Sequence, residues 1–115
     1  MGALTGIKIL DFSTLLPGPY ATMFLADLGA EVLRVTSPDK VDLVTQWPPF
    51  LEEGELSAAA AWLGRNKRTI FLNLKKPAAV GAVKELVKEY DIVVEQFRPG
   101  VMDKLGVGYE ALREV

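Results

Sequence analysis

The residue types available for chemistry are restricted in this chain. Its 115 residues include no cysteine and no histidine, with 13 Lys and Arg against 15 Asp and Glu. Without cysteine, the chain has no thiol nucleophile, no disulfide and no Cys-based metal or redox site. Without histidine it lacks the commonest general base and the commonest metal ligand. The groups that remain to be considered are carboxylates, basic side chains and the backbone N–H groups of loops.

Three loops have the composition of ligand-binding turns. They span residues 13–18, 37–40 and 97–100, and the first and third contain Gly and Pro and lead into expected helices. Helix N-termini present free N–H groups and a partial positive charge to anions. One interpretation is therefore an anionic, nucleotide-like ligand lying across the loops, and the other is that Gly and Pro only make tight turns. Neither a GxGxxG motif nor a P-loop is present.

Charged side chains outside these loops have two interpretations. Residues 65–68 (Arg-Asn-Lys-Arg) form the densest basic cluster. They could bind phosphate, since Arg and Lys are its usual ligands, or they could be a solvated strand entry. No basic stripe with interleaved aromatics accompanies them, which disfavours nucleic-acid binding. We expect Asp11 to cap the turn after the first strand and Asp27 to be structural.

Alternating segments of strand and helix position these groups. Apolar runs predict strands at residues 6–13, 31–36, 69–74 and 91–95. Helical spacing and Pro, Ser or Gly boundaries predict helices at 19–28, 57–63 (capped by Ser57), 77–90 and 101–105, with another beginning at 108. This order predicts an α/β fold, a doubly wound open parallel sheet with helices on both faces, in one domain (1–115) without an internal boundary. Ligands of such sheets bind beyond the carboxyl ends of the strands, where the three loops lie.

Net charge and hydropathy restrict the classes of partner that the chain can have. The net charge of −2 gives no general attraction to nucleic acid or anionic membranes, and no apolar run approaches the ~20 residues of a membrane span. Lys8 and Asp11 interrupt any secretory signal, so we expect a cytoplasmic protein. The mean hydropathy of +0.20 is high for a small domain. It indicates apolar surface that another segment or subunit covers, and Tyr20, Trp47 and Trp62 are expected in the core or at an interface.

Several motifs in order along the chain resemble the class III CoA-transferases (CaiB/BaiF family). This family includes formyl-CoA transferase, carnitine CoA-transferase, bile-acid CoA-transferase and α-methylacyl-CoA racemase. The resemblance is carried by residues 6–12, 17–21, 25–32, 66–70, 93–102 and 105–109. Within it, Asn-Lys-Arg-Thr-Ile at 66–70 is similar to the family's Asn-Lys-Arg-Ser-Ile, and Glu-Gln-Phe-Arg-Pro-Gly at 95–100 is similar to Glu-Asn-Phe-Arg-Pro-Gly.

The resemblance implies a Rossmann-like fold and a CoA-binding role. Family members are several times longer and form interlocked homodimers, so the chain would be the N-terminal part of the large CoA-binding domain. The implied function is the CoA-binding portion of an acyl-CoA:carboxylate CoA-transferase, with acyl-CoA and a carboxylic acid as substrates and no metal. The alternatives are an α-methylacyl-CoA racemase, a non-catalytic CoA-binding fragment, or a purely structural piece. The nucleophilic Asp of the transferases and the His–Asp pair of the racemases would lie downstream, so we assign no catalytic residue here and expect no turnover by these 115 residues alone.

The resemblance also implies which residues contact coenzyme A. They are Leu15, Leu16, Pro17, Leu72, Asn73, Leu74, Lys75, Gln96, Phe97, Arg98 and Lys104. Two departures from the family pattern matter. Many members have Glu-Arg-Pro where this chain has Thr-Ser-Pro at 36–38, so Arg34 or Lys40 would have to replace the missing arginine. Gln96 stands where the family usually has Asn.

Overall fold

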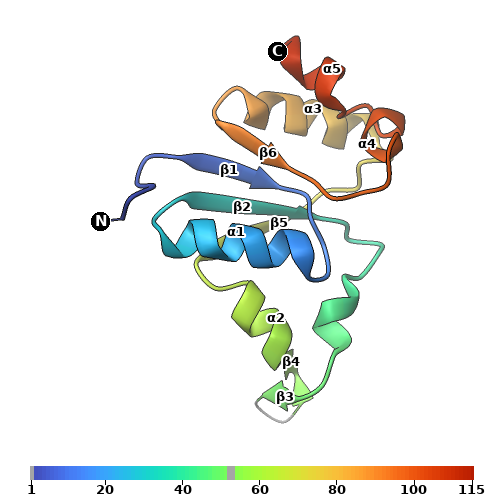
Figure 1. Ribbon diagram of the computed structural model, residues 1–115. Coiled ribbons are helices and arrows are strands. Elements are labelled where there is room, and N and C mark those ends of the chain that lie inside the picture. Colours follow the sequence, from blue (N-terminus) through green and yellow to red (C-terminus); the bar gives the residue numbers. More distant parts are fainter. Residues whose placement is uncertain (1, 52–53) are drawn as a thin grey trace.

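A four-stranded parallel sheet forms the centre of the fold (Figure 1). The computed structural model describes residues 2–51 and 54–115. The strand order is β5-β2-β1-β6, and the strands are β1 (Lys8–Asp11), β2 (Glu31–Thr36), β5 (Lys67–Phe71) and β6 (Ile92–Val94). After β5 the chain returns to pair β6 with the other side of β1, so the order reverses between β1 and β6. The predicted open parallel sheet is confirmed.

Both faces of the sheet are covered, as the apolar strand sequences predict. Ile9 and Val32 pack with Ala26 of α1 (Pro17–Asp27) on one face. Leu10 and Leu33 point to the opposite face. There they join the cluster of side chains from α3 (Pro77–Val87), α4 (Val101–Lys104) and α5 (Tyr109–Arg113). Figure 1 shows α1 and these three helices on opposite sides of the sheet.

Some element boundaries differ from the prediction. Helix α1 begins at Pro17 rather than residue 19, because proline is favoured in the first helical turn. Strand β5 begins at Lys67 instead of residue 69, directly after Asn66, which has a φ of 61°. It ends at Phe71, where its partner β2 also ends. Pairing with β2 thus set the limits of β5, whereas its first two residues, both basic, were predicted to precede the strand.

The segment between β2 and β5 projects from the sheet (Figure 1). It contains the 3₁₀-helix η1 (Leu43–Gln46), the short strands β3 (Phe50–Leu51) and β4 (Leu56–Ser57), and helix α2 (Ala58–Leu63). Ser57 Oγ accepts a hydrogen bond from Ala60 N at 3.4 Å, which confirms the predicted cap. A cluster of Met23, Val44 and Leu63 attaches this segment to α1. Among the described residues, none of the helices has the length and apolarity needed to traverse a bilayer.

Large apolar side chains are exposed on α1 and α2. Tyr20, Phe24 and Trp62 are 40%, 49% and 46% exposed. The Tyr20 ring lies 4.8 Å from the Phe24 ring and 5.5 Å from the Trp62 ring, centroid to centroid. Tyr20 and Trp62 are therefore surface residues of these 115 residues and not core residues. This is the kind of uncovered apolar surface that the mean hydropathy indicated.

Candidate functional site

A groove of about 680 Å³ opens at the carboxyl ends of the sheet strands. Residues from four segments line it: from 12–15 around the end of β1, from 35–43 around the end of β2, 72–75 after β5, and Phe97, Arg98, Val101 and Leu105 after β6. Parallel strands bring their carboxyl ends to one edge, so segments distant in sequence meet there. The loops after β1 and β6 leave the sheet where the strand order reverses, which is the usual ligand position in this class of fold.

The groove brings together seven of the eleven residues expected to contact a ligand. These seven are Leu15, Leu72, Asn73, Leu74, Lys75, Phe97 and Arg98. The other four, Leu16, Pro17, Gln96 and Lys104, are not among the described residues that line it. Leu16 and Pro17 adjoin Leu15 at the start of α1, whereas Lys104 is exposed at the end of α4.

The basic side chains in the groove are available to an anion. Lys40, Lys75 and Arg98 line it and are exposed. Within residues 2–51 and 54–115, none of the three forms an ion pair. One acidic wall residue, Asp39, accepts a hydrogen bond from Asn73 Nδ2 at 2.9 Å. Apolar walls with a few cations suit a ligand that has both an apolar arm and phosphates.

Gln96 fastens the loop between β1 and α1. Its Oε1 accepts a hydrogen bond from Gly18 N at 2.7 Å, and its Nε2 donates to the carbonyl oxygen of Thr14. The amide therefore bridges two backbone positions of the loop and is half-buried. The structure places Gln96 behind the groove wall, where it acts on the loop conformation.

Asp11 caps the same loop, as expected from the sequence. Its fully buried carboxylate accepts hydrogen bonds from Ser13 N at 2.8 Å and Ser13 Oγ at 2.5 Å on one oxygen, and from Thr22 Oγ1 at 2.6 Å on the other. The Nζ of Lys67 lies 3.8 Å from that second oxygen. A short loop and the first turns of α1 are thus tied to the end of β1.

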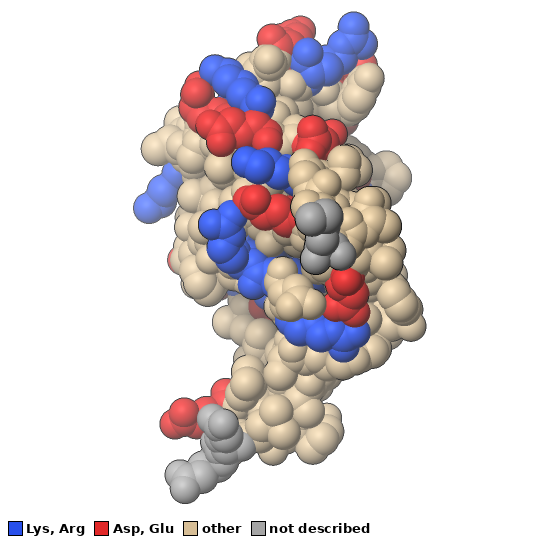
Figure 2. Space-filling model, turned by 90° about the vertical axis from the view of Figure 1, so that its left-hand side faces the viewer, with Lys and Arg blue, Asp and Glu red and all other residues tan. Residues whose placement is uncertain are grey.

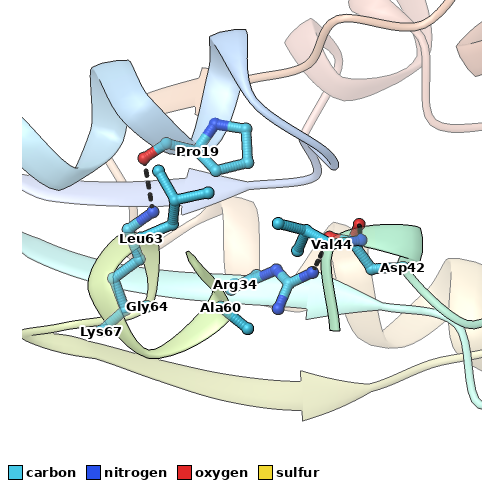
Figure 3. Close-up of a pocket in the computed structure, with 8 residues that line it drawn as sticks. All are labelled: Pro19, Arg34, Asp42, Val44, Ala60, Leu63, Gly64 and Lys67. Atoms are coloured by element: carbon cyan, nitrogen blue, oxygen red, sulfur yellow. Dashed lines mark hydrogen bonds and ion pairs between the residues drawn. The ribbon is translucent and has the colours of Figure 1, made fainter. Parts of the chain in front are cut away.

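Lys67 has a role that the sequence did not reveal. Only 1% of its side chain is exposed, and its Nζ donates to Thr22 Oγ1 at 2.7 Å. The same Nζ donates to the Pro19 carbonyl at 2.9 Å (Figure 3). Burial lowers the pKa of the Lys67 ammonium, and the nearby carboxylate of Asp11 acts in the opposite direction. The amine is therefore bound within the fold and cannot reach a ligand in the groove.

The remaining members of the basic cluster are also paired. Arg65 donates to Asp27 from Nε at 3.1 Å and from Nη2 at 2.6 Å, and Asn66 Nδ2 donates to the same carboxylate at 3.0 Å. The hydrogen bond from Arg65 lowers the pKa of Asp27. Arg68 pairs with Glu31. Arg65, Asn66 and Arg68 are exposed around the start of β5, which agrees with the solvated strand entry, whereas Lys67 is buried. Figure 2 shows basic and acidic side chains interspersed on its face of the molecule.

The comparisons with known proteins agree on one family. The family described as CoA-transferase family III matches residues 4–115. The chain belongs to this family. The human succinyl-CoA:glutarate CoA-transferase is 43% identical over 113 residues, which cover 97% of this chain and 25% of that protein. The acetyl-CoA:oxalate CoA-transferase of Acetobacter aceti is 35% identical over 114 residues, covering 99% of this chain and 29% of that one.

Solved structures with about one third of their residues identical share the fold. A CAIB/BAIF family protein from Brucella suis has a TM-score of 0.88 and 34% identity, over 98% of this chain and 30% of that chain. A hypothetical protein from Mycobacterium tuberculosis has a TM-score of 0.87 and 34% identity, over 99% and 31%. The chain thus spans between a quarter and a third of the length of these relatives.

Of the two side chains expected to replace the family arginine missing from residues 36–38, one lines the groove. Lys40, one of the two expected side chains, is exposed on the wall of the groove. Arg34, the other alternative, lines a separate small cavity and pairs with Asp42 (Figure 3). A guanidinium held by a carboxylate is not free to bind phosphate. Of the two cations, Lys40 is the one that lines the groove.

Asp42 is the functional candidate that sequence reasoning missed. An Asp before Leu43 and Val44 is a recognisable helix N-cap signal, and Val44 N does donate to Asp42 Oδ1 at 3.2 Å. Its contact with the loop after β1, however, spans 27 residues, and no local pattern predicts it.

Proposed function

We propose that this chain forms the CoA-binding portion of an acyl-CoA:carboxylate CoA-transferase. The observation that carries the proposal is the groove at the carboxyl ends of four parallel strands, lined by seven of the residues that the family resemblance assigns to CoA. The groove volume of about 680 Å³ is in the range of small-molecule sites. The ligand has two chemically different parts, and the lining matches both.

The basic residues would bind the charged end of CoA. Lys40, Lys75 and Arg98 are exposed and unpaired among the described residues, and Arg presents a planar donor fork to phosphate. The apolar residues Leu15 and Phe97 line the same groove and would pack along the pantetheine arm. The role of the chain is then to bind and orient the thioester.

The reacting groups are proposed to lie outside these residues. A CoA-transferase moves CoA from one carboxylic acid to another, and in this family a nucleophilic Asp beyond the matched segment is expected to carry the acyl group. The chain spans about a quarter of the human relative, which supports a longer parent protein. We expect no turnover by the 115 residues alone.

The activities for which the relatives are named favour transfer to a carboxylate acceptor. The human relative is named for glutarate, and others are named for mesaconate and oxalate, which are all dicarboxylates. The racemase alternative has no counterpart among these names and stays a prediction, as does the cytoplasmic location. A homodimer is supported by the exposed aromatic cluster of Tyr20, Phe24 and Trp62, and sedimentation of the protein would test it.

Calorimetric titration with CoA tests the proposed function. The protein should bind CoA, and Arg98→Ala should weaken binding about tenfold or more, because a charge-assisted hydrogen bond contributes ~1.5–3 kcal/mol. Lys88→Ala is the matched control, since Lys88 follows the end of α3, is exposed, does not line the groove and pairs with Glu85. Failure of the unmodified protein to bind CoA would refute the proposal.

A further inference from the structure

Asp42 lies between the groove and a smaller cavity behind it. It lines both the groove and the cavity of about 20 Å³ formed with Arg34, Lys67 and Leu63. Its side chain is only 3% exposed although it belongs to a loop. A buried carboxylate needs several donors to compensate for lost hydration. The identity of these donors indicates what Asp42 does.

The donors to Asp42 come from three parts of the chain. Oδ1 accepts hydrogen bonds from Leu15 N and Val44 N, both at 3.2 Å. Oδ2 pairs with the guanidinium of Arg34, which projects from β2 (Figure 3). The carboxylate thereby joins the loop after β1 to the segment after β2, and these are two walls of the groove.

Leu15 is the position where this contact matters most. Its φ is 63°, in the left-handed region that L-residues other than Gly, Asn and Asp rarely adopt. A leucine has no side-chain hydrogen bond to stabilise that conformation, so the backbone must be held from outside. Asp42 is the side chain that accepts the Leu15 N–H, and Leu15 lines the groove.

Arg34 fixes the carboxylate in turn. Its side chain is 18% exposed, and its Nε, which faces no hydrogen-bond partner among the described residues, is buried. The guanidinium is therefore committed to Asp42 and to the small cavity rather than to the groove. Arg34 thereby orients the Asp42 carboxylate toward Leu15.

We propose that Asp42, anchored by Arg34, is a positioning residue for CoA binding that holds Leu15 in its left-handed conformation at the groove wall. This inference rests on the proposed function of the groove. The Asp42 side chain is almost fully buried and bonded to Arg34, Leu15 and Val44. It acts through the backbone of Leu15 and lowers the conformational freedom of the loop before the ligand arrives.

Two readouts test the proposal in the full protein. Asp42→Ala should raise the dissociation constant for CoA about tenfold, the factor expected from loss of one charge-assisted hydrogen bond. It should also accelerate amide hydrogen exchange in residues 13–18. Asp27→Ala is the matched control, because it removes an exposed Asp–Arg pair away from the groove and should change neither readout.

A double variant separates positioning from stability. Asp42→Ala alone leaves the Arg34 guanidinium without its carboxylate. The double variant Arg34→Met with Asp42→Ala also removes the guanidinium, so most of the stability lost in the single variant should be recovered. CoA affinity should remain low, because Leu15 N still lacks its acceptor. If affinity returns together with stability, the role of Asp42 is structural and the proposal is wrong. The double variant also serves if Asp42→Ala alone does not fold.

The remaining outcomes distinguish this inference from the proposed function. If the unmodified protein binds CoA and the Asp42 variants bind it equally well, the inference is refuted and the proposed function stands. Unchanged hydrogen exchange in residues 13–18 also refutes the inference, whatever the ligand. If the unmodified protein does not bind CoA, the proposed function fails and the positioning role fails with it.

Discussion

Substitution of Asp11 by Asn is the sharpest test of the buried network beneath the groove loop. Asn has nearly the same volume as Asp, so the core packing around it is preserved. One oxygen can still accept the bonds from Ser13 N and Ser13 Oγ. The other position becomes an NH₂ group that faces Thr22 Oγ1, at 2.6 Å in the native geometry, and the Lys67 ammonium, at 3.8 Å.

The expected loss of stability follows from these contacts. Removing one partner of a buried ion pair costs ~3–5 kcal/mol, because the other charge is left buried. We expect the lower end, about 3 kcal/mol, since Lys67 keeps Thr22 Oγ1 and the Pro19 carbonyl as acceptors. Lys67 can also release its proton, because burial already lowers its pKa. A loss of this size is a large part of the ~5–15 kcal/mol that stabilises a typical domain.

Equilibrium urea unfolding, followed by tryptophan fluorescence, measures the effect. With an m value of ~1–3 kcal/mol/M, a loss of about 3 kcal/mol lowers the unfolding midpoint by about 1–3 M. The matched control is Asp27→Asn, which weakens a pair with Arg65 that water reaches on both sides. It should shift the midpoint far less. Equal shifts for the two variants would refute the idea that Asp11 is the centre of a buried charged network.

Three further results are expected. First, the free energy of unfolding should rise with pH between the lowered native pKa of Lys67 and its unfolded value of ~10.4, because the unfolded chain binds more protons in that range. Lys67→Met should flatten this alkaline rise, and equal slopes for the variant and the unmodified protein would contradict the prediction. Second, Gly18→Ala should destabilise the protein by ~1–3 kcal/mol or more in urea unfolding, since the new Cβ would lie 2.6 Å from Gln96 Oε1. The matched change Gly81→Ala in α3 places its Cβ in open space and should stabilise the protein by ~0.5–1 kcal/mol. Third, the resemblance predicts that Lys104→Ala raises the KM for acyl-CoA in the full-length enzyme. Because Lys104 does not line the groove among the described residues, the effect should be smaller than that of Arg98→Ala. An unchanged KM would place Lys104 in solvent.

The elements of the fold could be predicted wherever the signal was local. Glu31–Thr36 was predicted at its observed limits because its apolar run ends at Ser37 and Pro38. The end of α1 before Gly29 could also be predicted, because glycine readily adopts the left-handed conformation that follows many helices, and the φ of Gly29 is 105°. Strand β5 was displaced by two residues at its start, because its limits are set by pairing with β2 and not by its own composition.

The sequence by itself determined the order of the four sheet strands and of the helices beside them, and with it the edge of the sheet where the loops gather. Parallel strand topology places the loops after β1, β2, β5 and β6 at one edge whatever their side chains are. Seven of the residues that line the groove there were expected from the family resemblance, whereas η1, β3 and β4 were not predicted. Only the tertiary structure decided that the buried Lys67 ammonium donates hydrogen bonds to α1 and that the Asp42 carboxylate accepts a hydrogen bond from Leu15 N. Those contacts join residues 45 and 27 positions apart in the chain. A charged residue has no local pattern that reveals whether it will meet water or a distant partner, since its environment exists only after the chain has folded.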